Sequence, residues 1–429
     1  MSGVIDVAVV GAGPAGLAAA LAAGDLGCEV TLIDAGSGPG GQMYRPGMLF
    51  GGGRARRAAE HLPPRLARIR QVRQVRHLAM TSVGHAARGD DGVVTLAVGS
   101  PEGGAETTVE VRAVVLATGA VELVLPFPGW DRPGVTTAGA AHALLESQGV
   151  TVGRRVLVAG SGPALLPVAA SLARAGVRVV AVLEATAGLD GFPGPPAAGV
   201  LARHGVPVLT GCAVVACRGT DRVERAVVAR LDPDWRPVPG SGREETVDAV
   251  HLSFGVSPAL ELPRALGCAE VTHPSRPAAA VACDADLATS VPGVFAAGEV
   301  TGITGADAAE RQGYLAGTSA ARYLGRLSPD AYAERTRTLR ARLEDARRVA
   351  ARGASLRPGW LEWPDAGTVV CRCQETRWSD IGAAIADGAR DMHAVSAATG
   401  CGTGYCQGRV CGPALRYALS AAAGLPPAG

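Results

Sequence analysis

Ile5-Asp-Val-Ala-Val-Val-Gly-Ala-Gly-Pro-Ala-Gly16 opens the chain, and Val30-Thr-Leu-Ile-Asp34 follows after a run rich in Leu and Ala. The apolar, β-branched residues at 5–10 predict a buried strand, the glycines predict a turn, and the run to Gly27 predicts a helix. The second β-branched run predicts a parallel strand that ends in an acid, about 20 residues past the turn. These residues therefore predict a strand, turn, helix and strand unit of an α/β fold.

The glycines of this turn stand where side chains would obstruct a bound phosphate. Gly11 makes the tight turn, Gly13 lets the backbone approach a pyrophosphate, and Gly16 lets the helix pack on the strand. The first N–H groups of the helix then face the phosphates with a partial positive charge, and Asp34 accepts a hydrogen bond from a ribose hydroxyl. The unit therefore predicts a dinucleotide site.

Three later segments indicate that this dinucleotide is FAD. Gly40-Gly-Gln42 follows the second strand, and a strand over residues 113–116 runs into Ala117-Thr-Gly119. Far downstream, residues 290–299 predict a strand that ends in a Gly-Glu pair, before a glycine-rich turn and a helix from about Ala306. An extended FAD spans the sheet, so it needs such a late segment with an acid near its ribityl chain.

The motifs GxGxxG, GGQ, ATG and AAGE occur in this order along the chain. The set resembles the flavoprotein disulfide reductases of the thioredoxin- and glutathione-reductase type, which nest one Rossmann-like dinucleotide-binding domain inside another. By that resemblance Gln42 lies near the flavin ring, and Glu299, in place of the usual Asp, binds a ribityl hydroxyl. The residues expected to bind FAD are Gly11, Gly13, Pro14, Ala15, Gly16, Asp34, Gly41, Gln42, Thr118, Gly119, Gly298 and Glu299.

A second unit of the same kind is inserted into the first. Residues 154–159 predict a strand, Gly160-Ser-Gly162-Pro-Ala-Leu165 a turn, and residues 177–183 a strand that ends in Glu184. Gly160, Gly162 and Glu184 are the candidate contacts of a second nucleotide. Because no Arg follows Glu184 closely, NAD is favoured over NADP.

This second unit departs from the reductase pattern in two places. Leu165 replaces the third glycine, and Pro167 stands where such reductases have a glutamate near the nicotinamide. A vestigial fold, or a site for another adenine nucleotide, therefore stays open beside NAD binding.

The chain also lacks the redox C-x-x-C of these reductases. Cys212 and Cys217 form a C-x4-C pair in a strand-like run, and their spacing predicts side chains on opposite faces of a strand. We expect core or loop roles for both, and no disulfide reduction.

All 41 basic residues are Arg, and neither Lys nor Asn occurs among the 429 residues. This composition excludes a Schiff-base lysine, the lysine of a Walker phosphate loop and N-glycosylation. A net charge of +2 argues against nucleic-acid binding. One arginine-rich stretch suits either the docking of an acidic subunit or a solvated helix face. Its basic residues are Arg54, Arg56, Arg57, Arg65, Arg68, Arg70, Arg73 and Arg76.

The ten cysteines fall into two sets. The scattered set, expected to be buried as small hydrophobes, consists of Cys28, Cys212, Cys217, Cys268 and Cys283. The C-terminal set consists of Cys371, Cys373, Cys401, Cys406 and Cys411. Because the sequence carries no secretory signal or membrane-spanning pattern, clustered thiols predict metal ligands in a reducing compartment, and we expect a cytoplasmic protein.

The C-terminal thiols are arranged as C-x-C, a gap of 32 residues, and C-x4-C. Two pairs of thiolates suit a [2Fe-2S] cluster, one pair per iron, and short helices would direct N–H groups at its negative charge. A structural zinc is the alternative, although its cysteine pairs usually have C-x2-4-C spacing. The segment resembles the helical domain of bacterioferritin-associated ferredoxin, which implies Cys371, Cys373, Cys406 and Cys411 as ligands. Cys401 does not fit that spacing and is either a neighbour or a substitute ligand.

Four regions follow from these patterns. We expect a discontinuous FAD domain at residues 1–125 and 250–327, and an inserted NAD-type domain at residues 126–249. A helical connector, N-capped by Ser328, occupies residues 328–365, and the [2Fe-2S] domain occupies residues 366–424.

Over residues 5 to 420 the motifs GGQMYRP, GSGPALL, AAGEVTG and YCQGRVC resemble one group of flavoproteins. These are the larger subunits of membrane-associated or dye-linked amino-acid and opine dehydrogenases, including opine oxidases, hydrogen-cyanide synthase and proline or hydroxyproline dehydrogenases. The resemblance implies that substrate is oxidised at a flavin in a smaller, amino-acid-oxidase-type subunit. This chain would carry the electrons to a quinone, a respiratory chain or a ferredoxin-like acceptor, with peripheral membrane association through its partners.

The residues themselves agree with an electron carrier, because the eight histidines are isolated and no catalytic base or nucleophile stands in a motif. Two other functions stay open. One is a self-sufficient NADH-dependent flavin and iron–sulfur reductase, and the other is a redox-responsive binding module with the cluster as its sensor.

Overall fold

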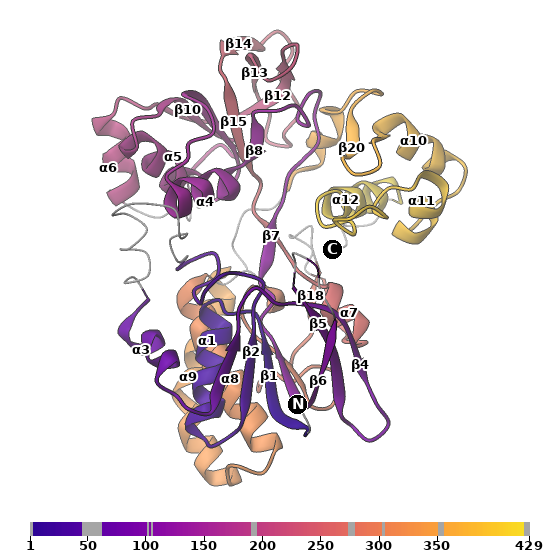
Figure 1. Cartoon of the computed structure of the whole chain (residues 1–429). Helices are drawn as coiled ribbons and strands as arrows, with labels where there is room; N and C mark the ends of the chain where they lie inside the picture. The colour runs from indigo at the N-terminus through magenta and orange to yellow at the C-terminus, as the bar shows by residue number, and fades with distance from the viewer. Residues whose placement is uncertain are drawn as a thin grey trace.

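The computed structural model describes residues 3–44, 62–100, 103, 106–189, 195–272, 279–302, 305–350 and 356–423. Two α/β lobes and a small helical module make up the fold, and Figure 1 shows the module beside the inserted lobe, above the first one. This is the nested arrangement of Rossmann-like units that the two glycine-rich turns predict.

The first lobe contains a seven-stranded sheet in the order β3-β2-β1-β6-β5-β4, with β19 beside β6. The pairs that join β1, β2, β3, β6 and β19 are parallel, and β4 and β5 are antiparallel additions. The late strand therefore returns to the first sheet, as the FAD interpretation requires. The strands are β1 (Ile5–Val10), β2 (Val30–Ile33), β3 (Val75–Leu78), β4 (Ser82–Arg88), β5 (Val94–Gly99), β6 (Thr107–Leu116) and β19 (Val294–Ala296).

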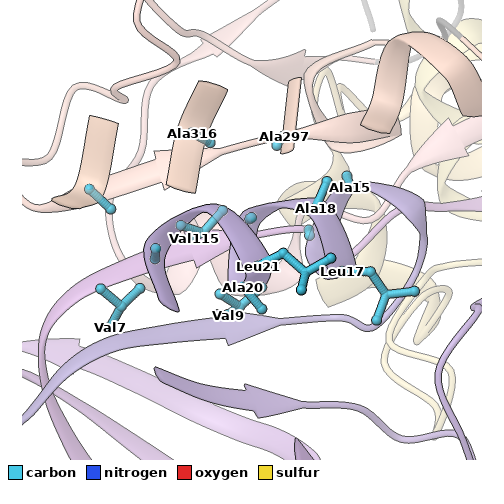
Figure 2. Close-up of a cluster of buried hydrophobic side chains, with 14 of the residues drawn as sticks. Val7, Val9, Ala15, Leu17, Ala18, Ala20, Leu21, Val115, Ala297 and Ala316 are labelled. Carbon is cyan, nitrogen blue, oxygen red and sulfur yellow. The ribbon is translucent and has the colours of Figure 1, made fainter. Parts of the chain in front are cut away.

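Small residues let two helices of this lobe pack almost in contact. A Cβ atom on Gly313 of α8 (Ala306–Tyr323) would lie 1.9 Å from the carbonyl oxygen of Ala15 on α1 (Pro14–Asp25). Figure 2 shows α1 side chains such as Leu17 and Leu21 packed with the strands beside them. The helix α9 (Pro329–Ala350) covers α8, and the hydroxyl of Tyr332 on α9 is hydrogen-bonded to Ser319 Oγ on α8 at 2.7 Å. The connector helix therefore belongs to the core of the first lobe. Short α3 (Pro64–Ala67) and η1 (Arg68–Arg70) lie before β3.

The inserted lobe contains an all-parallel sheet in the order β11-β10-β9-β15-β8. Its last strand in the sequence, β15, begins at residue 249, where the sequence placed the end of the insertion, so the sheet continues past that residue. Helices α4 (Ala138–Gln148), α5 (Leu165–Arg174) and α6 (Pro195–Arg203) accompany the sheet. The strands are β8 (Val135–Thr137), β9 (Arg155–Gly160), β10 (Arg178–Glu184), β11 (Val208–Thr210) and β15 (Ala249–Ser253).

A three-stranded antiparallel sheet of β12 (Cys212–Arg218), β13 (Arg225–Arg230) and β14 (Arg243–Thr246) adjoins it. The expectation that Cys212 and Cys217 leave opposite faces of their strand was wrong. The register shifts at a bulge between Val214 and Ala216, and the extra residue cancels the alternation. Both cysteines pack against the same core, so their structural role stands.

Two extended segments join the lobes, and they pair with each other as β7 (Ala120–Glu122) and β16 (Val256–Pro258). Figure 1 shows β7 running from the first sheet towards the inserted lobe. After β16 the chain forms α7 (Glu261–Ala265), β17 (Glu270–Val271) and β18 (Ala280–Val281), and after β19 it forms η2 (Gly298–Thr301).

The C-terminal module is anchored on the inserted lobe by aromatic side chains. Trp363 donates from Nε1 to the carbonyl oxygen of Trp235 at 2.9 Å, and Trp360 packs against Tyr417 with ring centroids 5.6 Å apart. Arg372 donates to the carbonyl oxygen of Trp130 and lies over its ring. The module consists of η3 (Pro358–Glu362), β20 (Val369–Cys371), β21 (Thr376–Arg377), α10 (Trp378–Ala386), α11 (Met392–Thr399) and α12 (Gly412–Ala422). None of the helices in the described ranges combines the length and apolarity that crossing a membrane requires.

Candidate cofactor sites

A cavity of about 830 Å³ opens at the carboxyl ends of β1, β2, β6 and β19. In a parallel sheet this edge is where ligands bind. The residues expected to bind FAD surround it, with the exception of Gly16. They are Gly11, Gly13, Pro14, Ala15, Asp34, Gly41, Gln42, Thr118, Gly119, Gly298 and Glu299.

The three glycines of the first turn have different surroundings. Gly11 has a φ of +105°, and a Cβ there would lie 2.2 Å from the carbonyl oxygen of Ala117. A Cβ on Gly16 would lie 1.7 Å from the carbonyl oxygen of Gly11, so this glycine serves the packing of helix on strand and does not line the cavity. A Cβ on Gly13 would meet nothing within 4 Å. Gly13 therefore leaves open space for a ligand beside the helix N-terminus.

Asp34 is held in place at the end of β2 by backbone donors. Its Oδ2 accepts from the N–H of Ala12 at 2.5 Å, and its Oδ1 accepts from the N–H of Gly36 at 2.7 Å. The carboxylate lines the cavity and ties the glycine-rich turn to the second strand. This position suits an acceptor for a ribose hydroxyl.

Glu299 lines the opposite part of the binding edge, after β19. Burial raises the pKa of its carboxyl above the ordinary range of glutamate. The preceding N–H, of Gly298, donates to Oε1 of Gln312 at 2.7 Å. Gln312 is 1% exposed, and Thr301 also donates to it at 3.1 Å. Sequence reasoning missed Gln312. The one indication of its role in the sequence is an amide side chain next to the small residues that form α8.

The inserted lobe also contributes to the cavity, which sequence reasoning missed. Ala140, Ala143, Leu144, Ser147 and Gln148 of α4 line one side. The helix is held there because Glu122 of the connecting strand accepts from the N–H of Gly139 at 2.8 Å. Thr137 caps the helix by accepting from Ala140 at 3.1 Å, and this N-cap was the one available sequence signal.

The second glycine-rich turn has a similar backbone and a more enclosed acid. A Cβ on Gly160 would lie 1.8 Å from the carbonyl oxygen of Ser253, whereas Gly162 has nothing within 4 Å. Glu184 is 0% exposed and accepts from the N–H of Gly162 at 3.0 Å and from both the N–H and the hydroxyl of Thr186. Burial raises the pKa of Glu184, against the lowering effect of these hydrogen bonds. A ribose would reach this carboxylate only after the side chain moved, so a nucleotide contact at Glu184 stays a prediction.

The C-terminal thiols form two groups in space, and neither group corresponds to one of the two cysteine pairs in the sequence. The sulfur atoms of Cys371, Cys401 and Cys411 all lie within 4.8 Å of one another, and these three residues are buried. Cys373 and Cys406 are half-buried and share a hydrogen bond between their thiols. Each group thus contains one member of C-x-C and one member of C-x4-C, with Cys401 added to the first.

Local backbone geometry creates the site around Cys406. A Cβ on Gly404 would lie 2.3 Å from Cβ of Cys373, so a glycine is required where the two loops meet. Desolvation alone would raise the pKa of Cys406, but the N–H groups of Val410, Gly408 and Arg409 and the Cys373 thiol lower it by hydrogen bonding. Backbone donors that converge on sulfur stabilise the charge of a thiolate or of a metal cluster.

This donor set fits a two-iron cluster. A [2Fe-2S] cluster needs two cysteine sulfurs at each of two irons, and the thiols are gathered in two groups. A single tetrahedral zinc would need four thiols around one point, whereas the compact group among the described residues contains three. With the cluster bound, Cys371 and Cys411 would serve one iron, and Cys373 and Cys406 the other.

The scattered cysteines have no part in these sites. Burial raises the pKa of Cys28, Cys217 and Cys268, for Cys217 to about 12. None of the scattered set lines the cavity described above. No cysteine is therefore among the described residues that line the cavity.

The arginine-rich stretch is described only in part. Arg54, Arg56 and Arg57 and the side chain of Arg65 lie outside the described residues. Arg68 forms an ion pair with Asp25 at 2.7 Å.

Comparison with known proteins identifies both regions. Residues 5–313 match the family described as pyridine nucleotide-disulphide oxidoreductase, and residues 369–421 match the BFD-like [2Fe-2S] binding domain. The chain is 31% identical to the HcnB component of hydrogen cyanide synthase of Pseudomonas aeruginosa, over 94% of this chain and 90% of that protein. It is also 31% identical to one of the subunits of opine oxidase from Agrobacterium tumefaciens, over 96% of this chain and 84% of that protein.

Solved structures agree on the fold. L-proline dehydrogenase from P. horikoshii matches with a TM-score of 0.69 and 20% identity, over 98% of this chain and 75% of that chain. Thioredoxin reductase from T. acidophilum matches with a TM-score of 0.56 and 20% identity, over 74% of this chain and 98% of that one. The two family matches indicate FAD and a [2Fe-2S] cluster as cofactors. The chain therefore belongs to the pyridine nucleotide-disulphide oxidoreductase family, is related to HcnB and the opine oxidase protein, and is an oxidoreductase with a C-terminal BFD-like [2Fe-2S] domain.

Proposed function

We propose that this chain is the FAD and [2Fe-2S] electron-transfer subunit of a hetero-oligomeric oxidoreductase. Its partner, an amino-acid-oxidase-type flavoprotein subunit, would oxidise an amino acid, an opine or a related amine. The observation that carries the proposal is the presence of a cavity lined by the expected FAD residues and of clustered thiols in one chain, joined by a short segment.

That segment is Ala259 to Glu261. Thr118, which lines the cavity, donates from Oγ1 to the carbonyl oxygen of Ala259 at 3.0 Å, and the N–H of Ala259 donates to Gly119 at 3.0 Å. Two residues later, Glu261 accepts from Nε of Arg409, which lies between Cys406 and Cys411, at 2.9 Å. The wall of the cavity and the loop that carries Cys406 and Cys411 are thus each hydrogen-bonded to the same short segment, a proximity that favours electron transfer between the two sites.

The outer thiol group supports an exit for electrons at the surface. Cys373 and Cys406 are half-buried, and the neighbouring Tyr405 is 90% exposed. The inner group, Cys371, Cys401 and Cys411, is buried. A redox partner therefore has access to one edge of the expected cluster, and a quinone, a respiratory chain or a ferredoxin-like protein would accept electrons there.

The chain's own residues supply position and charge rather than proton transfer. FAD can accept two electrons and release them singly to a one-electron cluster, which is the chemistry these groups supply when bound. In the proposed FAD site, Asp34 would fix the ribose, Gly13 and the first turn of α1 would bind the pyrophosphate, and Glu299 would bind the ribityl chain. The N–H groups of residues 408–410 would stabilise the charge on Cys406.

The relatives support a multi-subunit assembly. HcnB and the opine oxidase protein are each named as one subunit of a larger enzyme, and residues of this chain also match the alpha subunit of sarcosine oxidase. The absence of C-x-x-C and the enclosed Glu184 argue against a self-sufficient reductase.

The test is reduction of this chain through a partner. The chain would be co-expressed with an amino-acid-oxidase-type protein encoded beside it and purified as a complex. D- and L-amino acids, opines and glycine would then be mixed anaerobically with the complex and with the chain alone. We expect bleaching of flavin and cluster absorbance in the complex only. Rapid bleaching of the isolated chain by NADH would overturn the proposal in favour of a self-sufficient reductase.

A further inference from the structure

The thiol site contains one more cysteine than a [2Fe-2S] cluster uses. Cys401 is 0% exposed, and its sulfur lies within 4.8 Å of the sulfurs of both Cys371 and Cys411. We propose that Cys401 is a reserve ligand, able to bind the iron of this inner group in place of Cys411. The inference rests on the cluster of the proposed function.

Cys401 and Cys411 are positioned by different elements. Cys401 follows the C-terminus of α11, where its N–H donates to Thr399 Oγ1 at 3.2 Å and its carbonyl oxygen accepts from Ser396 at 2.7 Å. Cys411 is the N-cap residue of α12. Removing the sulfur of Cys411 therefore leaves the backbone that holds Cys401 unchanged.

The outer group has no such reserve among the described residues. The thiol of Cys406 hydrogen-bonds with that of Cys373, and the compact set around Cys371 does not include either of them. The two halves of the site should therefore differ in their tolerance of cysteine loss. This asymmetry distinguishes a reserve ligand from a cysteine that only fills space.

The exchange is a substitution of ligands without electron transfer. In a chain that lacks the Cys411 sulfur, an Fe–Sγ bond to Cys401 forms during cluster assembly, in the place of the Fe–Sγ bond to Cys411. The proton of the Cys401 thiol passes to the buffer. Iron and sulfide keep their oxidation states.

The experiment compares four variants of the full chain with the wild type: Cys401→Ala, Cys411→Ala, Cys406→Ala and the double variant Cys401→Ala/Cys411→Ala. Each is reconstituted with iron and sulfide, and iron and acid-labile sulfide per chain are measured. The electron paramagnetic resonance spectrum of the dithionite-reduced protein is recorded. Bound FAD and the thermal unfolding temperature establish that each variant is folded.

We expect about two irons per chain in the wild type, Cys401→Ala and Cys411→Ala, and a shifted spectrum in Cys411→Ala. Cys406→Ala and the double variant should lose the cluster. Loss of the cluster from folded Cys411→Ala would overturn the proposal, and so would its loss from Cys401→Ala. If Cys411→Ala proves unfolded, Cys411→Val, whose side chain also has no ligand atom, gives the same comparison with and without Cys401→Ala. A wild-type chain without labile sulfide would overturn the proposed function as well.

Discussion

Arg409, between Cys406 and Cys411, donates from Nε to Oε1 of Glu261 at 2.9 Å. Two residues before Glu261, Ala259 is hydrogen-bonded to Thr118 and Gly119 of the cavity wall. The side chains of Arg409 and Glu261 are partly exposed, at 45% and 32% of their side-chain area. An exposed ion pair of this kind contributes only about 0–1 kcal/mol to folding. Its importance would therefore lie in fixing the distance between the two cofactors.

We expect Arg409→Gln to slow electron transfer from flavin to cluster several-fold and to leave the unfolding temperature almost unchanged. The measurement is anaerobic stopped-flow absorbance at flavin and cluster wavelengths. Arg236→Gln is the control, because Arg236 donates from Nε to Glu362 at the same distance of 2.9 Å, and additionally to Asp234, and is not among the residues that line the cavity. Equal rates for the wild type and Arg409→Gln would contradict the positioning role.

Asp34 allows a test of the FAD site by affinity. Asp34→Ala removes the carboxylate expected to bind the ribose, and a hydrogen bond to a charged group is worth about 1.5–3 kcal/mol. We therefore expect FAD affinity to fall about 10- to 100-fold, measured by fluorescence titration of the apoprotein. Asp25, at the end of α1, forms an ion pair with Arg68, and Asp25→Ala, which removes only this pair, should bind FAD normally. Unchanged affinity of Asp34→Ala would place the ribose elsewhere.

Gly13 and Gly16 should respond differently to the same added side chain. A Cβ on Gly13 meets open space, so Gly13→Val is expected to fold normally and to lose bound FAD. A Cβ on Gly16 would lie 1.7 Å from the carbonyl oxygen of Gly11, so Gly16→Val should destabilise the first lobe by a few kcal/mol. Chemical denaturation and FAD content measure the two effects. A Gly13→Val protein that retains FAD would contradict the proposed pyrophosphate position.

Local patterns predicted the first lobe well. The β-branched runs at residues 5–10 and 30–33 coincide with β1 and β2. The runs mark the strands this clearly because strands buried in a parallel sheet are apolar along their whole length. The acid at Asp34 and the late strand β19 also lie where the glycine-rich turn requires them. In this lobe the residues that favour each strand locally are also the residues that the tertiary structure requires there.

Tertiary contacts account for what the sequence did not indicate. The α4 face that lines the cavity depends on Glu122 accepting from the N–H of Gly139, a contact between the connecting strand and the inserted lobe. The bulge before Ala216 altered the faces of Cys212 and Cys217, and spacing alone does not encode a bulge. Spacing identified the C-terminal cysteines as a set, but the helix α11 determines which thiols Cys401 joins.

His251 should make the inserted lobe sensitive to acid. It is 0% exposed on β15, Nδ1 lies 2.8 Å from Thr136 Oγ1, and burial lowers its pKa to about 4 from an ordinary 6.5. Between these two values the unfolded chain binds a proton at this histidine and the folded chain does not. The free energy of unfolding therefore falls as pH falls through this window, by about 2 kcal/mol between pH 7 and pH 5.

His251→Gln removes this titration, so its free energy of unfolding should depend less on pH than that of the wild type. Because Trp130, Trp235, Trp360 and Trp363 belong to the core of the inserted lobe and the module, tryptophan fluorescence in urea reports their unfolding. Glu184, whose pKa is raised by burial, adds stability as pH falls, and this effect is common to both proteins and cancels in their difference. The exposed His204→Gln serves as the control. A difference between wild type and His251→Gln that stays constant from pH 7 to pH 5 would show that His251 does not titrate as its burial predicts.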